Sequence, residues 1–237
     1  SIFLAGGILG TFHHLYFAGT PMSIIAIGAS FSALEVVPLV LIGFEGWHNY
    51  KLSQAKEWVL NYKWPIWCML AVAFWNMLGA GIFGFLINPP IALYYMQGLN
   101  TTPLHGHTAL FGVYGMLGIG LMLFVAKGLA APGRWKQKLI SFSFWSINLG
   151  LLLMALLSLL PVGLMQTVAS VNHGLWYARS DEFLGTGLMD TFKWLRVVGD
   201  TLFAIGTLTL GWFVLGLKFG WSLIPEDDSR DDGGSNP

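Results

Sequence analysis

The stretch 104–127, LHGHTALFGVYGMLGIGLMLFVAK, decides the fold class, because it is apolar for long enough to cross a lipid bilayer as one α-helix. Its two histidines, His105 and His107, stand at the start of this helix and are separated by a single glycine. Positions i and i+2 of an α-helix point about 200° apart, so the two imidazoles cannot bind one metal ion. We expect them to serve two sites, as in a membrane helix that holds one haem on each flank.

The composition places the chain in the lipid bilayer. Of its 237 residues, 55% are hydrophobic and 10% are charged, and the mean hydropathy is +0.64. A soluble domain carries roughly 25% charged residues. The formal net charge is zero and no basic cluster runs along one face, so we expect no nucleic-acid binding. The single cysteine, Cys68, excludes disulfide frameworks and cysteine zinc sites by number alone.

Six apolar segments predict an all-α fold, a polytopic transmembrane helix bundle. They cover about 1–17, 22–45, 64–86, 104–127, 139–165 and 198–222. We predict one transmembrane catalytic bundle segment over 1–224, followed by a disordered polar tail at 225–237. The first segment rises only about 24 Å from Ser1 to Tyr16, which is short of the roughly 30 Å hydrocarbon core. These helices are therefore expected to be the C-terminal part of a larger bundle.

Loop charges predict the topology. Lysine and arginine are frequent in the connections 46–63 and 127–138, so the positive-inside rule makes these loops cytoplasmic, and the C-terminus with them. The first helix then runs outward and carries His13 and His14 near its outer end. The helix of 104–127 runs inward and starts at the outer side. All four histidines are therefore expected at one depth.

Several histidines at one depth predict metal binding better than a single one does. Imidazole suits iron, copper and zinc, and the adjacent His13 and His14 can turn toward one metal if the last helical turn relaxes. A lone interfacial histidine is more often a hydrogen-bonded structural residue. We favour that interpretation for His173, and we expect His48, in a basic loop, to be solvated.

Glu35 is an isolated carboxylate in the membrane-spanning part of its helix. A buried acid that is ionised and unpaired costs at least several kcal/mol, so Glu35 is a candidate proton relay. The alternative is a structural hydrogen bond to Ser30, Ser32 or a backbone carbonyl. Three further polar residues lie in apolar surroundings, namely Asn76, Asn148 and Asp200, and we expect Asp200 at the start of its helix. For each of them, an interhelical hydrogen bond is as good an interpretation as a role in proton or quinone handling.

Four strings carry a resemblance to a known family. They are GTFHHLYFAGTP at 10–21, FSALEVVPL at 31–39, INPPIALYYMQGLN at 87–100, which leads into HGH at 105–107, and NHGLWYARS at 172–180. They resemble the nitric oxide reductases of the haem-copper oxidase superfamily. The resemblance covers nearly the whole chain and is greatest to the catalytic C-terminal half of the quinol-dependent, single-chain type.

The resemblance implies two haem b groups and one non-haem iron. His13 and His14 would bind the non-haem iron, His105 the high-spin haem facing it, and His107 the low-spin haem. Glu35 would be a catalytic residue that delivers protons. A third histidine and a glutamate on the non-haem iron, and the second axial histidine of the low-spin haem, would come from the N-terminal half of the catalytic chain. The segment alone is therefore expected to be catalytically incomplete.

The implied reaction converts two NO, two electrons and two protons into N2O and water, with quinol as the donor. The implied location is a bacterial-type inner membrane, and the sequence leaves open whether two copies form a homodimer. Within the superfamily, a haem-copper oxygen reductase and a nitric oxide dismutase-like protein remain alternatives. Oxygen reductases use a tyrosine near copper, and residues 1–12 contain none, which disfavours the relatives that place it on this helix. Relatives with the tyrosine on an earlier helix stay open. A non-enzymatic transporter or structural subunit with a structural metal is the alternative from another class.

Overall fold

The computed structural model describes residues 2–34, 37, 40, 41, 44, 61–131 and 133–224. Glu35, His48 and the tail 225–237 lie outside these ranges, so the predictions made for them stay predictions. In the described part the chain is helical, with one isolated bridge between Trp135 and Leu223. The α-helices are α1 (Ile2–Gly10), α2 (Met22–Leu34), α5 (Lys63–Trp75), α6 (Gly84–Ile87), α7 (Pro90–Met96), α8 (Thr101–Gly106), α9 (Met116–Val125), α10 (Gln137–Met154), α11 (Leu160–His173), α12 (Asp181–Leu184) and α13 (Gly187–Phe219).

Tighter and wider turns connect several of these helices. The segments η1 (Thr11–Leu15) and η6 (Tyr177–Arg179) are 3₁₀ turns, and η2 (Asn76–Phe83), η3 (His107–Gly115), η4 (Ala126–Ala130) and η5 (Ala155–Leu159) are π-helical. Most of the π-helical segments are flanked by α-helix, so they widen long helices without ending them. Such wide turns inside α-helices occur frequently at functional sites.

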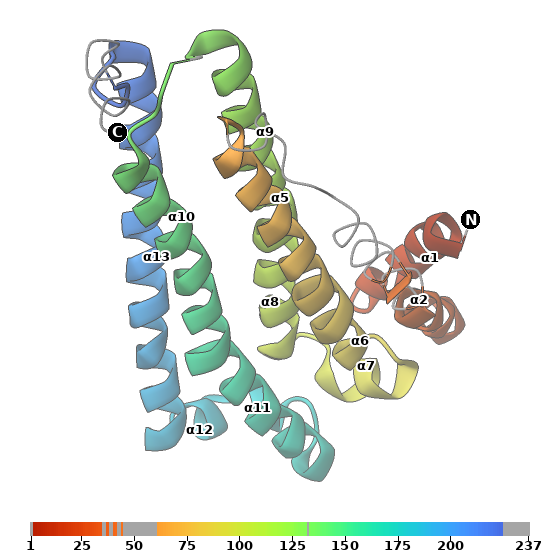
Figure 1. Ribbon diagram of the computed structural model, residues 1–237. Coiled ribbons are helices and arrows are strands. Elements are labelled where there is room, and N and C mark those ends of the chain that lie inside the picture. Colours follow the sequence, from red (N-terminus) through yellow and green to blue (C-terminus); the bar gives the residue numbers. More distant parts are fainter. Residues whose placement is uncertain are drawn as a thin grey trace.

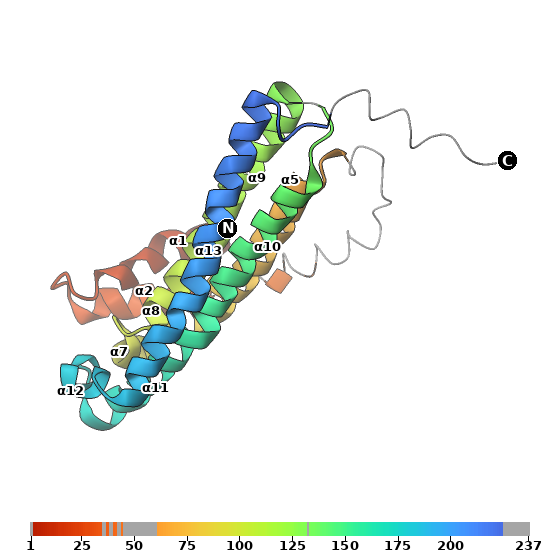
Figure 2. The same cartoon turned by 90° about the vertical axis from the view of Figure 1, so that its left-hand side faces the viewer.

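Four continuous helical stretches are long and apolar enough to cross a bilayer, which confirms the predicted all-α transmembrane fold. They run over Lys63–Ile87, Thr101–Leu129, Gln137–His173 and Gly187–Phe219. The N-terminal α1 and α2 are shorter, with 9 and 13 residues in the described part. Figures 1 and 2 show these two helices together at one side of the long ones.

The predicted start of the last helix is wrong. The sequence predicts this helix over 198–222, yet α13 begins at Gly187. Its first turns carry charges that lower the hydropathy, but these charges pair at helical spacing and so support the helix. Two ion pairs do this, Lys193–Asp190 at 3.3 Å and Arg196–Asp200 at 3.0 Å.

The predicted end of the fifth helix, near residue 165, is also wrong. The helix continues to His173 although Pro161 lies inside it. The π-helical segment η5 directly precedes this proline, and Pro161 occupies the first turn of α11. Inside a regular α-helix the proline ring would clash with the carbonyl four positions earlier, and the wide turn of η5 stands where that carbonyl lies.

The longest helix pair, α10 with α13, packs closely because glycine stands at the contacts. A Cβ added to Gly150 would lie 2.5 Å from the backbone N of Phe203, and a Cβ added to Gly206 would lie 2.8 Å from the backbone N of Ile147. Small residues allow helix backbones in a membrane to approach in this way. Figures 1 and 2 show α10 and α13 side by side along most of their length. This pair forms one flank of the bundle, and α13 reaches the helix that carries His107.

Candidate metal centre

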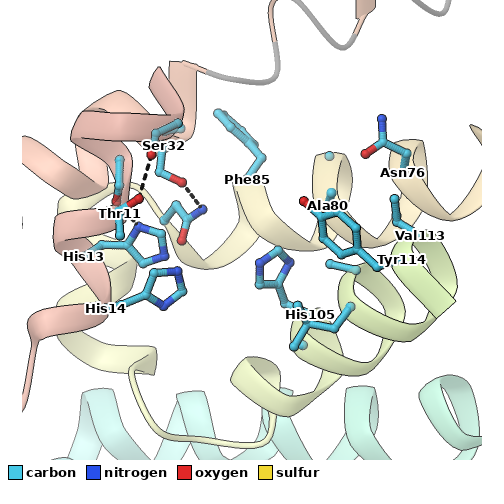
Figure 3. Close-up of a pocket in the computed structure, with 18 residues that line it drawn as sticks. Thr11, His13, His14, Ser32, Asn76, Ala80, Phe85, His105, Val113 and Tyr114 are labelled. Atoms are coloured by element: carbon cyan, nitrogen blue, oxygen red, sulfur yellow. Dashed lines mark hydrogen bonds between the residues drawn. The ribbon is translucent and has the colours of Figure 1, made fainter. Parts of the chain in front are cut away.

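A cavity of about 390 Å³ lies between the N-terminal helices and the long helices. Figure 3 shows His13 and His14 on one side of this cavity and His105 opposite them. The wall also contains polar side chains from several helices, namely Thr11, Ser32, Asn76 and Asn88. The cavity therefore brings together imidazoles from segments about ninety positions apart in the sequence, whereas loop charge and helix direction predicted only that the histidines lie at one depth.

The adjacent histidines can share a side because the chain tightens where they stand. His13 and His14 lie in the 3₁₀ turn η1, and their ring centroids are 4.0 Å apart. Gly28 of α2 packs directly against this turn, since an added Cβ would lie 2.6 Å from the backbone N of His13. As a result His13 is only 7% exposed, whereas His14 is exposed in the described part of the chain.

Three histidines have the same hydrogen bond to the main chain. Nδ1–H of His13 donates to the Gly10 carbonyl at 2.5 Å, that of His105 to Gly79 at 2.8 Å, and that of His107 to Pro103 at 2.7 Å. A carbonyl oxygen only accepts, so each Nδ1 carries the proton and each Nε2 keeps its lone pair. This tautomer, fixed by a bond from the second nitrogen, is the usual state of a metal-ligating histidine.

His105 and His107 lie on different sides of their helix. The ring of His105 faces η2 and α6, where a Cβ added to Gly84 would be 3.0 Å from its Cε1. The Nε2 of His107 instead faces α13, 3.4 Å from Nη2 of Arg196. His105 lines the cavity and His107 is not among the lining residues. The two imidazoles therefore face separate spaces, as the i, i+2 spacing predicts.

The donor set fits metals that prefer imidazole, but the described residues do not complete any site. In the described ranges no group of three or more His, Cys, Asp or Glu side chains lies close enough to hold one ion. His13 and His14 offer two nitrogens on one side of the cavity, and His105 offers one across it. The buried Oδ1 of Asn88 also has no hydrogen-bond partner within the described part. Each metal position would need ligands from elsewhere.

Comparisons with known proteins identify the family of the chain. Residues 1–202 match the family described as cytochrome c and quinol oxidase polypeptide I. The chain belongs to this family. A nitric oxide reductase subunit from Stutzerimonas stutzeri is 28% identical over 217 residues, which cover 86% of this chain and 43% of that relative. The chain thus spans less than half the length of that relative, and the resemblance to nitric oxide reductases is confirmed.

Other polar residues of this oxidase-family chain take structural positions. Asn148 accepts a hydrogen bond from Nε1 of Trp75 at 2.8 Å, which is an interhelical contact. His173 is exposed, and its ring centroid is 5.0 Å from that of Tyr177. The predicted place of Asp200 at the start of its helix is wrong, because it lies inside α13 and pairs with Arg196. Asn76 does line the cavity.

Two polar residues near the histidines were not predicted. Nδ2 of Asn88 donates to Oγ of Ser32 at 2.7 Å, which joins the end of α6 to α2 beside the cavity. Arg196 meets His107 from α13. The Asn-Pro-Pro string could have predicted the place of Asn88, because a helix usually ends at the residue before a proline. No local pattern connects Arg196 with His107.

Proposed function

We propose that this chain is the C-terminal catalytic part of a membrane nitric oxide reductase that converts two NO to N2O and water. The observation that carries the proposal is the cavity between His13–His14 and His105, with the Nε2 lone pairs of His13 and His105 left free by their main-chain hydrogen bonds. The similarity to a bacterial nitric oxide reductase subunit supports it. Two electrons and two protons balance the reaction, and quinol is the proposed donor.

Each histidine has a proposed ligand. His13 and His14 would hold non-haem iron, His105 the high-spin haem b across the cavity, and His107 the low-spin haem b on the other side of the helix. When bound, these irons supply the electrons and the Lewis-acid stabilisation that joining two NO molecules requires. The chain's own contribution is to fix the rings. The bonds to Gly10, Gly79 and Pro103 prevent each ring from turning its Nδ1 toward the metal.

Proton delivery is assigned to Glu35. It follows Ser32 by three positions, and Ser32 lines the cavity. The cavity wall also holds the amides of Asn76 and Asn88, which can hydrogen-bond water near the histidines. Residues that bind water in an otherwise apolar membrane interior suit the transfer of protons to a buried reaction.

The proposed partners complete the site and supply electrons. The N-terminal half of the catalytic chain would contribute the third histidine and the glutamate to the non-haem iron, because only two imidazoles face that position in the described part. Lipid surrounds the spanning helices, and we place the protein in a bacterial-type inner membrane with a cytoplasmic C-terminus.

The test is metal analysis with optical spectra on the intact complex that contains this chain. We expect two haem b groups and one further iron per catalytic chain, without copper. Replacing His13 and His14 together by alanine should remove the further iron and leave both haem spectra. Replacing the exposed His173 by alanine is the matched control and should change neither. A colourless wild-type preparation would refute the proposal and favour a transporter or structural subunit.

A haem-copper oxygen reductase is the second candidate, because the family description itself names oxidases. Such enzymes place a tyrosine near the copper. Among the described tyrosines Tyr114 lines the cavity, but Figure 3 shows it beyond His105 and away from His13 and His14. This position disfavours the oxygen reductases whose tyrosine lies on the helices described, and relatives with that tyrosine on an earlier helix stay open. Copper in place of the third iron would reverse the preference.

A further inference from the structure

We propose that the outer surface of α10 binds one phospholipid with an anionic headgroup. This surface has two hollows, of about 570 and 270 Å³, and Trp145 and Leu149 line both of them. The larger hollow is lined by α10 from Lys138 to Leu149 and by Leu202 of α13. The smaller hollow lies between α10 and α5. The histidines line neither hollow, so this inference does not depend on the proposed function.

The larger hollow follows α10 for the depth of one lipid leaflet. Its residues on α10 recur at spacings of three and four, so they share one side of the helix. They are Lys138, Ser141, Phe142, Trp145, Ser146 and Leu149. From Lys138 to Leu149 the helix rises about 17 Å, which is close to half of the roughly 30 Å hydrocarbon core. One end of the hollow is therefore charged and the rest is mainly apolar, as in a phospholipid lying along the helix.

The smaller hollow gives the same surface a second apolar space beside the first. Its lining is apolar and aromatic except for the amide of Asn148. Oδ1 of this amide accepts from Nε1 of Trp75, and its Nδ2 donates to the carbonyl of Phe144, each at 2.8 Å. The amide is therefore satisfied without a polar ligand. Two adjacent spaces that need no polar partner suit the two acyl chains of one phospholipid.

Three exposed cations lie at the headgroup end, namely Arg134, Lys136 and Lys138. Within the described ranges none of them forms an ion pair, and the described acidic residues lie in α12 and the first half of α13. Hydrogen bonds to the segment after α13 hold the loop before α10 in place. The backbone N of Lys136 donates to Ser222 at 2.9 Å, and the carbonyl of Arg134 accepts from Ile224 at 2.8 Å.

The start of α10 favours an anion for an independent reason. This helix begins at Gln137 with no side-chain cap and no acidic residue in its first turn. The N-terminus of a helix carries a partial positive charge, so cations beside it are unfavourable and a phosphate is favourable. Each lysine or arginine near an anionic lipid contributes about fivefold to binding. The charges at this end therefore select an anionic headgroup over a zwitterionic one.

The position of this surface leaves it available to lipid. Figure 2 shows α1 and α2 projecting from one side of the long helices, with α5 and α10 on the other side. The cavity of His13, His14 and His105 lies on the side of α1 and α2. Polypeptide that completes this cavity is expected on that side, so the surface of α10 stays free for a lipid.

The experiment is native mass spectrometry of the detergent-purified intact complex. It is titrated with palmitoyl-oleoyl phosphatidylglycerol or with phosphatidylcholine that has the same chains. The wild type should bind one phosphatidylglycerol at least fivefold more tightly than phosphatidylcholine. Lys138→Gln should lower the affinity for phosphatidylglycerol about fivefold and leave that for phosphatidylcholine unchanged. Lys218→Gln is the matched control, because it removes an exposed cation that lines neither hollow, and it should change neither affinity.

A second variant tests the acyl-chain part of the site. Trp145→Ala should weaken the binding of both lipids, because this half-exposed side chain lines both hollows. Trp194→Ala is its control, since Trp194 is exposed on α13 and lines neither hollow. If Trp145→Ala does not fold, Leu149→Ala takes its place with the same expected result.

Three results would overturn the proposal. They are equal affinities of the wild type for the two lipids, an unchanged affinity for phosphatidylglycerol in Lys138→Gln, and a wild type that binds no lipid because another polypeptide covers this surface. None of these measurements uses haem, iron or turnover. Failure of the lipid site would therefore leave the proposed function untouched, and a colourless preparation could still confirm the lipid site.

Discussion

Replacing Gly79 by alanine should separate η2 from η3 and loosen His105. An added Cβ at position 79 would lie 2.6 Å from the carbonyl carbon of Thr108 and 2.8 Å from its Cβ. These are backbone and near-backbone atoms that cannot swing away, so the two helices must move apart. The carbonyl of Gly79 accepts from Nδ1 of His105 at 2.8 Å, and this bond moves with it.

The expected loss in the free energy of unfolding has two contributions. Overpacking a well-packed contact costs about 1–3 kcal/mol, and a weakened hydrogen bond to a buried ring adds about 0.5–1.5 kcal/mol. We therefore expect Gly79→Ala to lower the free energy of unfolding by about 2–4 kcal/mol. The loosened ring should also weaken the proposed high-spin haem site, because the imidazole can then turn.

The assay is thermal unfolding of the detergent-purified protein, together with the spectrum of the proposed high-spin haem. Gly118→Ala is the matched control, because a Cβ there meets nothing within 4 Å and the residue lies in the same long helix as His105. It should stabilise the protein by about 0.5–1 kcal/mol, since alanine loses less backbone entropy than glycine. Equal stability changes in the two variants would refute the packing argument.

Three further predictions concern buried polar groups and protons. Asn148→Leu should lower stability by about 1–3 kcal/mol in thermal unfolding, because Nε1 of Trp75 loses its acceptor in an apolar contact. The double variant Trp75→Phe with Asn148→Leu should recover part of that loss, and a double variant as unstable as the sum of both changes would contradict the hydrogen-bond account. Glu35→Gln should slow NO turnover with both haem spectra intact, and unchanged turnover would remove Glu35 from proton delivery.

Periodicity and hydropathy were sufficient for the main features of the fold. The i, i+2 spacing predicted that His105 and His107 face different sides, and the structure places one against η2 and the other against α13. Loop charge and helix direction predicted only a common depth for the four histidines, and the structure adds that three of them, His13, His14 and His105, line one cavity. These predictions needed only helix geometry and the cost of charge in lipid.

The remaining features depend on contacts between distant parts of the chain. Arg196 and His107 are 89 positions apart, and Asn88 and Ser32 are 56 apart, so no local pattern joins them. The early start of α13 was missed because hydropathy counts Lys193 and Arg196 against a helix, although both pair with acids on the same helix. A charge is paired only if its partner lies close in space, and a hydropathy average over the sequence contains no such distances.

The main-chain hydrogen bonds of the histidines also differ in the sequence separation between donor and acceptor. This difference affects the order in which the rings are oriented while the protein is made and inserted. His13 and His107 use carbonyls three and four positions earlier in their own helical turns, so these rings can be oriented as soon as each segment is synthesised and inserted. His105 uses Gly79, 26 positions away on another helix. Its ring can be oriented only after the two segments have associated. Incorporation of the cofactor proposed at His105 should therefore follow helix pairing, whereas the imidazole of His107 is oriented earlier.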